Sequence, residues 1–351
     1  MKNRILFVAA IVAVAAVAAF LVWPESEKDL TLYCSVDQDQ SLEIVNKFKV
    51  ATGITVNFQG ETEASRGVGI TQALVHEQKH PRADVLWANE IMNTVYMRDI
   101  GLFAPLPPGI ADSFPPEWRD PKGRYVAFGA RARILLVNTA LLPDPKDWPT
   151  SVDDLVDPKW GGKDRGVAVA IPLTGTTYTH AVAMLVRDAD AGKAFWTQVA
   201  DRVQKGEVKA FPGNGAVMQR VKDPKNGIAW GMTDTDDAYS AITEGAPVAV
   251  VYPDQAEGKP GTVLIPNTVA LIQGAPNPEA GRKLLEWLVS KDTEALLARG
   301  PTAQMPLRED VPVPAHVKKP GKDFRAAVVD WQAVGAKRED WLGFLRGLFQ
   351  R

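Results

Sequence analysis

The chain has 351 residues, of which 46% are hydrophobic and 23% are charged, and its formal net charge is -2. These values are typical of an ordinary globular protein with one large or two medium domains. The sequence contains no run of basic residues with interleaved aromatic residues, so we expect no nucleic-acid partner.

The N-terminus carries the pattern of an export signal. Lys2 and Arg4 precede an unbroken apolar stretch over residues 5–23, and a positive segment before such a stretch is typical of secreted proteins. As a helix the stretch would be about 28 Å long, close to the thickness of a bilayer. Residues 1–28 are therefore predicted to be a cleaved signal peptide or a membrane anchor, with the rest of the chain in the periplasm or another extracytoplasmic space.

The first part of the chain reads as repeated strand and helix. Cys34, the single cysteine, lies in the first predicted strand, where we expect a small buried residue and no intramolecular disulfide. The alternation indicates a mostly parallel sheet with helices on its faces. The predicted strands cover residues 29–34, 54–58 and 83–87, the predicted helices cover residues 38–51 and 70–77, and a proline-rich connection follows over residues 105–121.

The second part of the chain continues the α/β pattern. Residues 125–138 resemble an extended pair of strands, at which we expect the chain to cross into a second domain. Trp87 and Trp230 are expected in the core, and the four histidines lack metal-binding spacing, so no histidine ligand is predicted. Strands are predicted at residues 167–171, 228–232, 247–252 and 263–272, and helices at residues 178–187, 191–205, 238–244, 278–290 and 324–349.

Three aspartates stand out in the segment from Gly227 to Gln255. Asp234, Asp236 and Asp237 follow a predicted strand and lead directly into a predicted helix. One interpretation is helix capping, with Asp234 at the N-cap and Asp237 three residues later. The other is a site for a hard cation or a cationic organic group, because ligands of open α/β sheets lie outside the carboxyl ends of strands. The two interpretations are compatible, and both stay open.

The same aspartates offer an enzymatic alternative. An apolar strand ending in Asp234-x-Asp236 is also typical of magnesium-dependent phosphatases that use an aspartyl nucleophile. Those enzymes have Thr or Val two residues after the second aspartate and carry the motif near the start of the domain. Here Ala238 occupies that position, and the motif lies deep in the second half of the chain. We therefore predict that the protein is not an enzyme and has no catalytic residue or catalytic cofactor.

Several segments resemble one known family by their sequence and order. They include LTLYCS at 30–35, PRADVLWANE at 81–90, LLVNTALL at 135–142, DPKWGGK at 157–163, IPLTGTTYTH at 171–180 and GMTDTDDA at 231–238. In this order they resemble the periplasmic substrate-binding proteins of ABC importers, specifically the ferric-iron-binding branch of the type 2 group. The resemblance covers nearly all of the chain after the predicted export segment.

The resemblance implies an α/β fold with two lobes joined by crossing strands and a ligand cleft between the lobes. Lobe 1 would comprise residues 29–130 and 255–351, and lobe 2 would comprise residues 131–254. Such proteins close by a hinge when ligand binds. The family further implies a monomer that delivers its ligand to an ABC permease in the inner membrane and touches the membrane only through its N-terminal segment.

The resemblance also implies where a metal would bind. Asp37 falls where the metal-binding members have a histidine. Asn89, with Glu90 beside it, falls where they have a glutamate, and Asp236 and Asp237 fall where they have two tyrosines. The implied ligand set is oxygen-only and rich in carboxylate, which suits Fe(III) or another hard cation.

A second group of residues matches the small-anion site of the family at a helix N-terminus. Asn214 and Asp234 fall at further polar positions of the cleft, and the turn itself is matched by Thr174, Gly175, Thr176 and Thr177. Helix capping by the threonines and a turn role for Asn214 are the structural alternatives. The same fold is also compatible with an organic cation, an aminophosphonate or a sugar phosphate. An anionic ligand alone would be repelled by the aspartates unless a cation or an arginine balanced them.

Overall fold

The computed structural model describes residues 30–61, 69–162 and 165–350. The predicted export segment therefore lies outside the described residues. Within these ranges, no helix combines the length and the apolar character that crossing a bilayer requires.

Nine strands form the framework of the described part of the chain. They are β1 (Leu30–Cys34), β2 (Val56–Gly60), β3 (Val85–Ala88), β4 (Val126–Asn138), β5 (Gly166–Ala170), β6 (Val208–Phe211), β7 (Ile228–Asp234), β8 (Val248–Val251) and β9 (Leu264–Leu271). Their order is β2-β1-β3-β9-β4-β7-β5-β6, and β8 also pairs with β4. β1 is parallel to β2 and β3, and β5 is parallel to β6 and β7, whereas β9 runs antiparallel to β3 and β4.

Helices pack around this framework and connect its strands. They are α2 (Gln38–Thr52), α3 (Gly69–His76), α4 (Ile91–Asp99), α5 (Gly175–Arg187), α6 (Ala189–Gln204), α7 (Asn214–Lys222), α8 (Thr235–Thr243), α9 (Pro278–Leu288), α10 (Lys291–Arg299) and α11 (Trp331–Phe349). The sequence prediction of an α/β fold is confirmed.

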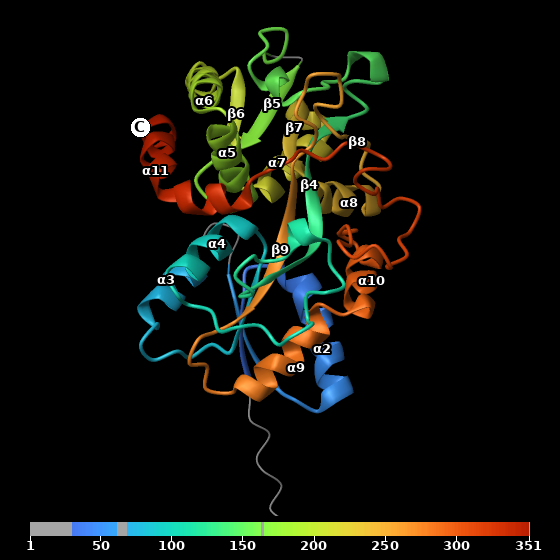
Figure 1. Ribbon diagram of the computed structural model, residues 1–351. Helices are drawn as coiled ribbons and strands as arrows, with labels where there is room; N and C mark the ends of the chain where they lie inside the picture. Colours follow the sequence, from blue (N-terminus) through green and yellow to red (C-terminus); the bar gives the residue numbers. More distant parts are fainter. Residues whose placement is uncertain (1–29, 62–68, 163–164, 351) are drawn as a thin grey trace, which may run out of the picture.

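The strands divide into two groups, which share β4 (Figure 1). The first sheet half contains β1, β2, β3, β9 and the start of β4, with α2, α3, α4, α9 and α10 around it. The second sheet half contains the end of β4 with β5, β6, β7 and β8, and α5 to α8 lie around it. The long strands β4 and β9 run through the middle of the molecule and connect the two groups.

β4 joins the two groups because its two ends pair with different neighbours. Residues 126–132 pair with β9, and residues 133–138 pair with β7 and β8. The register shifts at a bulge around Gly129, whose φ is 48°. A Cβ atom at Gly129 would lie 3.1 Å from the Leu297 side chain and 3.2 Å from that of Gln304. Both the backbone conformation and the space therefore favour glycine.

The core consists of two clusters of buried apolar side chains, which the alternation along the strands places on opposite faces of the sheet. Leu32 and Cys34 pack in one cluster with Phe48 of α2, whereas Tyr33 and Leu86 pack in the other. Cys34 is buried and forms no disulfide. Trp87 and Trp230 are also fully buried, so the core positions predicted for these three residues are confirmed.

The C-terminal helix α11 packs against α4, α5 and α6 and so contacts both groups of elements. The hydroxyl of Tyr178 on α5 donates to the carbonyl of Arg338 at 2.6 Å, and the guanidinium of Arg338 donates to the side chain of Asn93 on α4. Gly335 lies so close to α4 that an added Cβ would approach the Val95 side chain to 2.3 Å. α11 therefore ties the two halves of the molecule together.

Some elements differ from the sequence prediction. The expected strand pair over residues 125–138 is one long strand, and the C-terminal helix starts at Trp331 rather than at Phe324. The sequence analysis did not predict α4, β6, α7 or α10. α4 is buried around most of its circumference and mixes polar with apolar residues, so it has no apolar stripe for a pattern search to detect.

Candidate functional site

A polar pocket lies between the two sheet halves, where several helices begin. Asp37 directly precedes α2, Thr174 precedes α5, Gly213 precedes α7 and Asp234 precedes α8. All four residues line the pocket, which we call the aspartate pocket. The first turn of each helix presents backbone N–H groups and the positive end of the helix dipole. The backbone of this pocket therefore stabilises negative groups, whether carboxylates of the protein or oxygens of a ligand.

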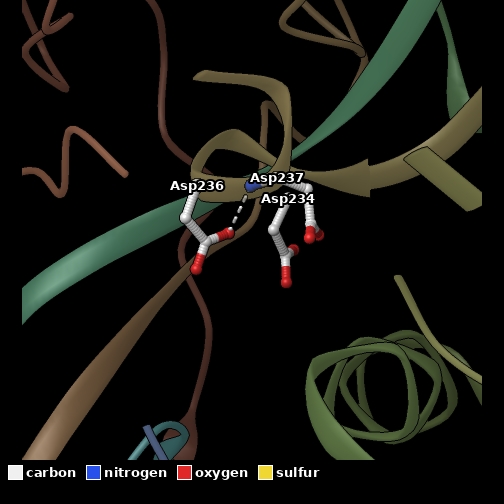
Figure 2. A group of neighbouring side chains, drawn as sticks. All are labelled: Asp234, Asp236 and Asp237. Carbon is white, nitrogen blue, oxygen red and sulfur yellow. Dashed lines mark hydrogen bonds between the residues drawn. The ribbon is translucent and has the colours of Figure 1, made fainter. Parts of the chain in front are cut away.

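Three carboxylates converge at the start of α8 (Figure 2). Asp234, Asp236 and Asp237 each offer an oxygen within 4.8 Å of the others. The backbone N–H of Asp237 donates to Asp236 Oδ1 at 3.1 Å, and the hydroxyl of Thr233 donates to Asp237 Oδ2 at 2.7 Å. Asp234 occupies the N-cap position, but its side chain makes no capping hydrogen bond. The capping interpretation of the Asp234 side chain is therefore wrong.

Two buried arginines of β4 hold the first two of these carboxylates. Arg131 and Arg133 are two residues apart and so lie on the same face of the strand. Arg133 is the cross-strand neighbour of Asp234 and donates to its Oδ1 at 2.6 Å. The Nε of Arg131 donates to Asp236 Oδ2 at 2.8 Å. Asp234 and Asp236 are thus already charge-balanced, whereas Asp237 accepts its hydrogen bond from a hydroxyl.

The environment disfavours three charged carboxylates side by side. Burial raises the pKa of Asp237 well above its ordinary value, and the nearby Asp236 and Asp234 raise it further. Burial also raises the pKa of Asp234, although Arg133 acts in the opposite direction. A cation placed among these oxygens would favour their ionised forms, because it would offset the mutual repulsion of the carboxylates.

The first turns of α5 and α7 form another wall of the aspartate pocket. Thr176 and Asn214 both donate to Asp234 Oδ2, and the hydroxyl of Thr177 donates to Asn214 Oδ1 at 2.9 Å. Thr174 makes no side-chain capping bond, and Gly175 has a φ of 58° with open space where a Cβ would lie. These side chains are engaged with Asp234 or face the pocket, so the capping alternative for the threonines does not hold.

The first sheet half contributes less to the pocket. Asp37 and Asn89 line it, and Asn89 Oδ1 accepts a hydrogen bond from the Ser35 hydroxyl at 3.1 Å. The backbone carbonyl of Asn89 also accepts from Arg131 of β4. The structure therefore brings Asp37 and Asn89 together with Asp236 and Asp237, as the resemblance implies.

Glu90, which the resemblance implies as a possible metal ligand, does not line the aspartate pocket and is engaged in other hydrogen bonds. Its carboxylate accepts from the backbone N–H of Met92 at 2.7 Å and of Asn93 at 3.1 Å. It also accepts from the Thr179 hydroxyl at 2.8 Å. Glu90 is the buried N-cap of α4, and burial raises the pKa of its carboxyl group. Of the two adjacent candidates, Asn89 is the one that faces the pocket.

Sequence reasoning missed the most important charged partners of the site. Arg131 and Arg133 stand at alternate positions in an otherwise apolar strand, and such paired charges in a buried strand indicate buried carboxylate partners. Sequence reasoning also missed that Asn214 is the first residue of a helix, because α7 was not predicted. Asn214 therefore lies in the first turn of α7 rather than in an isolated turn.

Comparison with known proteins gives the family. Residues 43–325 match the family model described as bacterial extracellular solute-binding protein. The chain belongs to this family. Members of this family are the substrate-binding components of ABC importers. The predicted role in transport and the predicted extracytoplasmic location follow from this membership.

One curated relative and two solved structures illustrate the similarity. The chain is 26% identical over 332 residues to "Iron uptake protein A1" of Synechocystis sp., covering 89% of this chain and 84% of the relative. Iron-bound HitA from Pseudomonas aeruginosa superposes with a TM-score of 0.79 at 20% identity, covering 92% of this chain and 99% of HitA. AfuA from Actinobacillus pleuropneumoniae, with exogenous fructose-6-phosphate bound, gives 0.78 at 17% identity, covering 93% and 99%.

These similarities confirm the predicted two-lobed periplasmic binding protein fold of this solute-binding protein. The Synechocystis relative is named as an uptake protein, and AfuA is named as a periplasmic binding protein. HitA and AfuA, two neighbours of nearly equal structural similarity, hold chemically different ligands. The fold alone therefore does not select the ligand, and the choice depends on the side chains of the aspartate pocket.

Proposed function

We propose that this solute-binding protein captures a hard metal cation, of the Fe(III) type, in the aspartate pocket and delivers it to an ABC permease in the inner membrane. Asp236 and Asp237 would be the primary ligands, and Asp37 and Asn89 would complete the site from the first sheet half. The observation that carries the proposal is the convergence of three carboxylates within 4.8 Å at the start of α8.

The chemistry of the donor atoms supports a hard cation. Carboxylate and amide oxygens are ligands of hard cations, and a high count of carboxylates strengthens binding of a highly charged ion. Asp237 has a raised pKa because it is buried beside two further carboxylates, and a bound cation would reverse that penalty. The iron-related names of one relative and one structural neighbour agree with this chemistry.

An anion would accompany the cation at the first turns of α5 and α7. Helix N-termini bind anions through backbone N–H groups and the helix dipole. Thr174, Gly175, Thr176 and Thr177 would contact the anion, with Asn214 and Asp234 holding this wall in place through the hydrogen bonds that join them. The anion would fill the remaining coordination positions of the metal.

Ligands from both sheet halves would explain closure of the cleft. A cation that touches both sides binds the closed form more tightly than the open form and shifts the population toward it. We propose lobe bounds of residues 29–130 with 255–351 and residues 131–254. The protein would act as a monomer without catalytic activity, exported by residues 1–28 and tethered to the membrane through residues 5–23 if that segment is retained.

A sugar phosphate is the second candidate ligand. The helix N-termini suit a phosphate group, and the carboxylates suit sugar hydroxyls as hydrogen-bond acceptors. The ion pairs of Asp234 with Arg133 and of Asp236 with Arg131 remove part of the repulsion that an anionic ligand would meet. AfuA, which holds fructose-6-phosphate, is the structural neighbour that supports this candidate.

Calorimetry on the purified full-length protein distinguishes the two candidates. Ferric citrate, calcium, magnesium and fructose-6-phosphate would each be titrated into the wild type and into Asp237→Asn. We expect a hard cation to bind the wild type and to bind Asp237→Asn at least about 100-fold more weakly, which equals about 2.8 kcal/mol. Glu294→Gln, a buried acid outside the pocket, is the matched control and should bind as the wild type does.

The opposite pattern would reject the metal proposal. If fructose-6-phosphate binds without any metal and no cation binds, the second candidate replaces the first. If no compound of the panel binds, or if Asp237→Asn binds cations as the wild type does, the aspartate pocket is not a cation site.

A further inference from the structure

A network of buried polar side chains connects the two sides of the aspartate pocket. Each member is at most 6% exposed and forms a hydrogen bond with the next. The members, which we call the amide network, are Gln40 of α2, Gln304 after α10, Asn267 of β9 and Arg131 of β4. Buried polar groups are rarely left unpaired, so a connected network of this kind fixes the orientation of each member.

Arg131 is the member that reaches the aspartate pocket. Its Nε donates to Asp236 Oδ2 at 2.8 Å, and its Nη1 donates to the backbone carbonyl of Asn89. Asp236 belongs to the second sheet half and Asn89 to the first, so one guanidinium is bonded to a proposed ligand residue on each side of the pocket. A shift of Arg131 would therefore displace both residues.

Asn267 fixes the third nitrogen of the Arg131 guanidinium. Its Oδ1 accepts from Arg131 Nη2 at 2.7 Å, and its Nδ2 donates to the carbonyl of Gly129 at 2.5 Å and to Gln304 Oε1 at 2.6 Å. Arginine can only donate and a carbonyl can only accept, so the amide of Asn267 has a single orientation that satisfies both. Gly129 is the bulge residue of β4, two positions before Arg131. Asn267 therefore fixes the guanidinium directly and also the backbone that leads to it.

The other end of the amide network reaches the helix that follows Asp37. Gln304 Nε2 donates to Gln40 Oε1 at 2.9 Å, and Gln40 Nε2 donates to the hydroxyl of Thr302. Gln40 lies in the first turn of α2, and Asp37 is the N-cap residue of that helix. The network that orients Asp236 therefore also contacts the helix that places Asp37 in the pocket.

We propose that Asn267 is a positioning residue for the cation site. By fixing the guanidinium of Arg131, it holds the Asp236 carboxylate and Asn89 in place on opposite sides of the cation. The inference rests on the proposed cation function of the aspartate pocket. Asn267 is not among the residues that line this pocket, so it acts through Arg131 rather than by touching the ligand. Loss of a residue that orients the direct ligands typically lowers metal affinity by about 10–100-fold.

Calorimetry with ferric citrate on the full-length protein tests this role. Asn267→Leu keeps a branched side chain and leaves the charge of Arg131 in the protein, so a change in affinity reports the position of the guanidinium. We expect ferric citrate to bind Asn267→Leu at least about tenfold more weakly than the wild type. Equal affinity in the two proteins would overturn the proposal.

Asn138→Leu is the matched control for a general loss of stability. Asn138 is also a 0% exposed asparagine of a central strand. Its side chain donates to the carbonyl of Val221 and accepts from the backbone N–H groups of Ala140 and Leu141, away from Arg131. Asn138→Leu should therefore lower the urea midpoint and bind ferric citrate as the wild type does.

A double-mutant cycle shows whether Asn267 acts through Arg131. In that case the double variant Arg131→Gln/Asn267→Leu binds ferric citrate no more weakly than Arg131→Gln alone. Losses of affinity that add instead would overturn the proposal. Should Asn267→Leu not fold, Gln304→Leu, which removes an acceptor of Asn267 Nδ2, is titrated in its place. We expect it to bind at least about threefold more weakly, and unchanged affinity would overturn the proposal.

Failure of this inference is distinguishable from failure of the proposed function. A wild type that does not bind ferric citrate would reject the cation site itself, and the role of Asn267 with it. A wild type that binds ferric citrate no better than Asn267→Leu would reject only the role of Asn267.

Discussion

The two sides of the aspartate pocket use buried carboxylates in different ways. On the second sheet half, Asp234 and Asp236 are held by Arg133 and Arg131 and keep oxygens near the pocket. On the first sheet half, Glu90 is enclosed by backbone N–H groups and a hydroxyl and does not reach it.

Glu294 of α10 repeats the second pattern farther from the pocket. Its carboxylate accepts from three backbone N–H groups, those of Gly129 at 2.8 Å, Leu307 at 3.0 Å and Arg308 at 3.0 Å. These bonds fix the bulge of β4 against the segment after α10. A carboxylate whose oxygens all accept from backbone N–H groups stabilises the fold. A carboxylate that is held by side chains beside several helix N-termini can still bind a ligand.

The largest effect should come from breaking the arginine pair of Asp234. Asp234→Ala leaves the fully buried Arg133 without its carboxylate, and we expect the free energy of unfolding to fall by about 3–5 kcal/mol. Urea unfolding followed by tryptophan fluorescence measures this. Asp201→Ala, which removes an exposed partner of Lys205, should change stability by less than about 1 kcal/mol. If Asp234→Ala left the free energy of unfolding unchanged, the Asp234–Arg133 pair would not stabilise the second sheet half.

The second effect compares the two sides directly. We expect Asp37→Asn to weaken cation binding by about tenfold or less, that is by at most about 1.4 kcal/mol, against at least about 100-fold for Asp237→Asn. The reason is that Asp237 belongs to the cluster of three carboxylates, whereas Asp37 approaches from the other side. Calorimetry with ferric citrate gives both values. A greater loss in Asp37→Asn would show that the first sheet half dominates binding.

A smaller effect is expected on the wall formed by α5 and α7. Thr177→Val removes the hydroxyl that donates to Asn214 and accepts from Arg133, and we expect it to weaken binding of the accompanying anion by about 1 kcal/mol. The control is Thr179→Val, whose hydroxyl donates to Glu90 away from the pocket; it should lower stability without changing the anion affinity. Affinities measured with citrate and with carbonate as the partner anion of iron decide between these outcomes.

The smallest effect concerns how Glu294, in the first sheet half, makes the stability of the protein depend on pH. Burial raises the pKa of Glu294, and the backbone N–H groups offset this in part. When the pKa of a carboxyl group is higher in the folded than in the unfolded state, the protein loses stability as pH rises from the unfolded-state pKa, about 4.3 for Glu, through the folded-state pKa. The loss is about 1.4 kcal/mol for each unit by which the two pKa values differ. Glu294→Gln lacks this loss.

The measurement for Glu294 is a series of urea unfolding curves across that pH range. The difference in unfolding free energy between Glu294→Gln and the wild type should move in favour of the variant as pH rises. Glu286→Gln, which changes an exposed acid of α9, should show a smaller slope. A difference that stays constant with pH would show that Glu294 has the same pKa in the folded and unfolded states.

The local pattern of the sequence determined most of the elements and part of the site. The apolar strands β1 and β7, the buried Trp87 and Trp230, and the placement of Asp234, Asp236 and Asp237 between a strand and a helix all follow from neighbouring residues. Such features are predictable because strand and helix periods act over a few positions. The resemblance added Asp37 and Asn89, which lie far from the aspartates in sequence and beside them in the pocket.

Only the tertiary structure decided which polar groups are used up. Arg133 meets Asp234, 101 residues away, because β4 and β7 pair in one particular register. Glu90 rather than Asn89 caps α4, because α4 begins at Ile91 and the Glu90 carboxylate accepts from the backbone N–H groups of Met92 and Asn93. Register and buried helix packing depend on contacts distant in sequence, so they fix the partners of each carboxylate after the chain has folded.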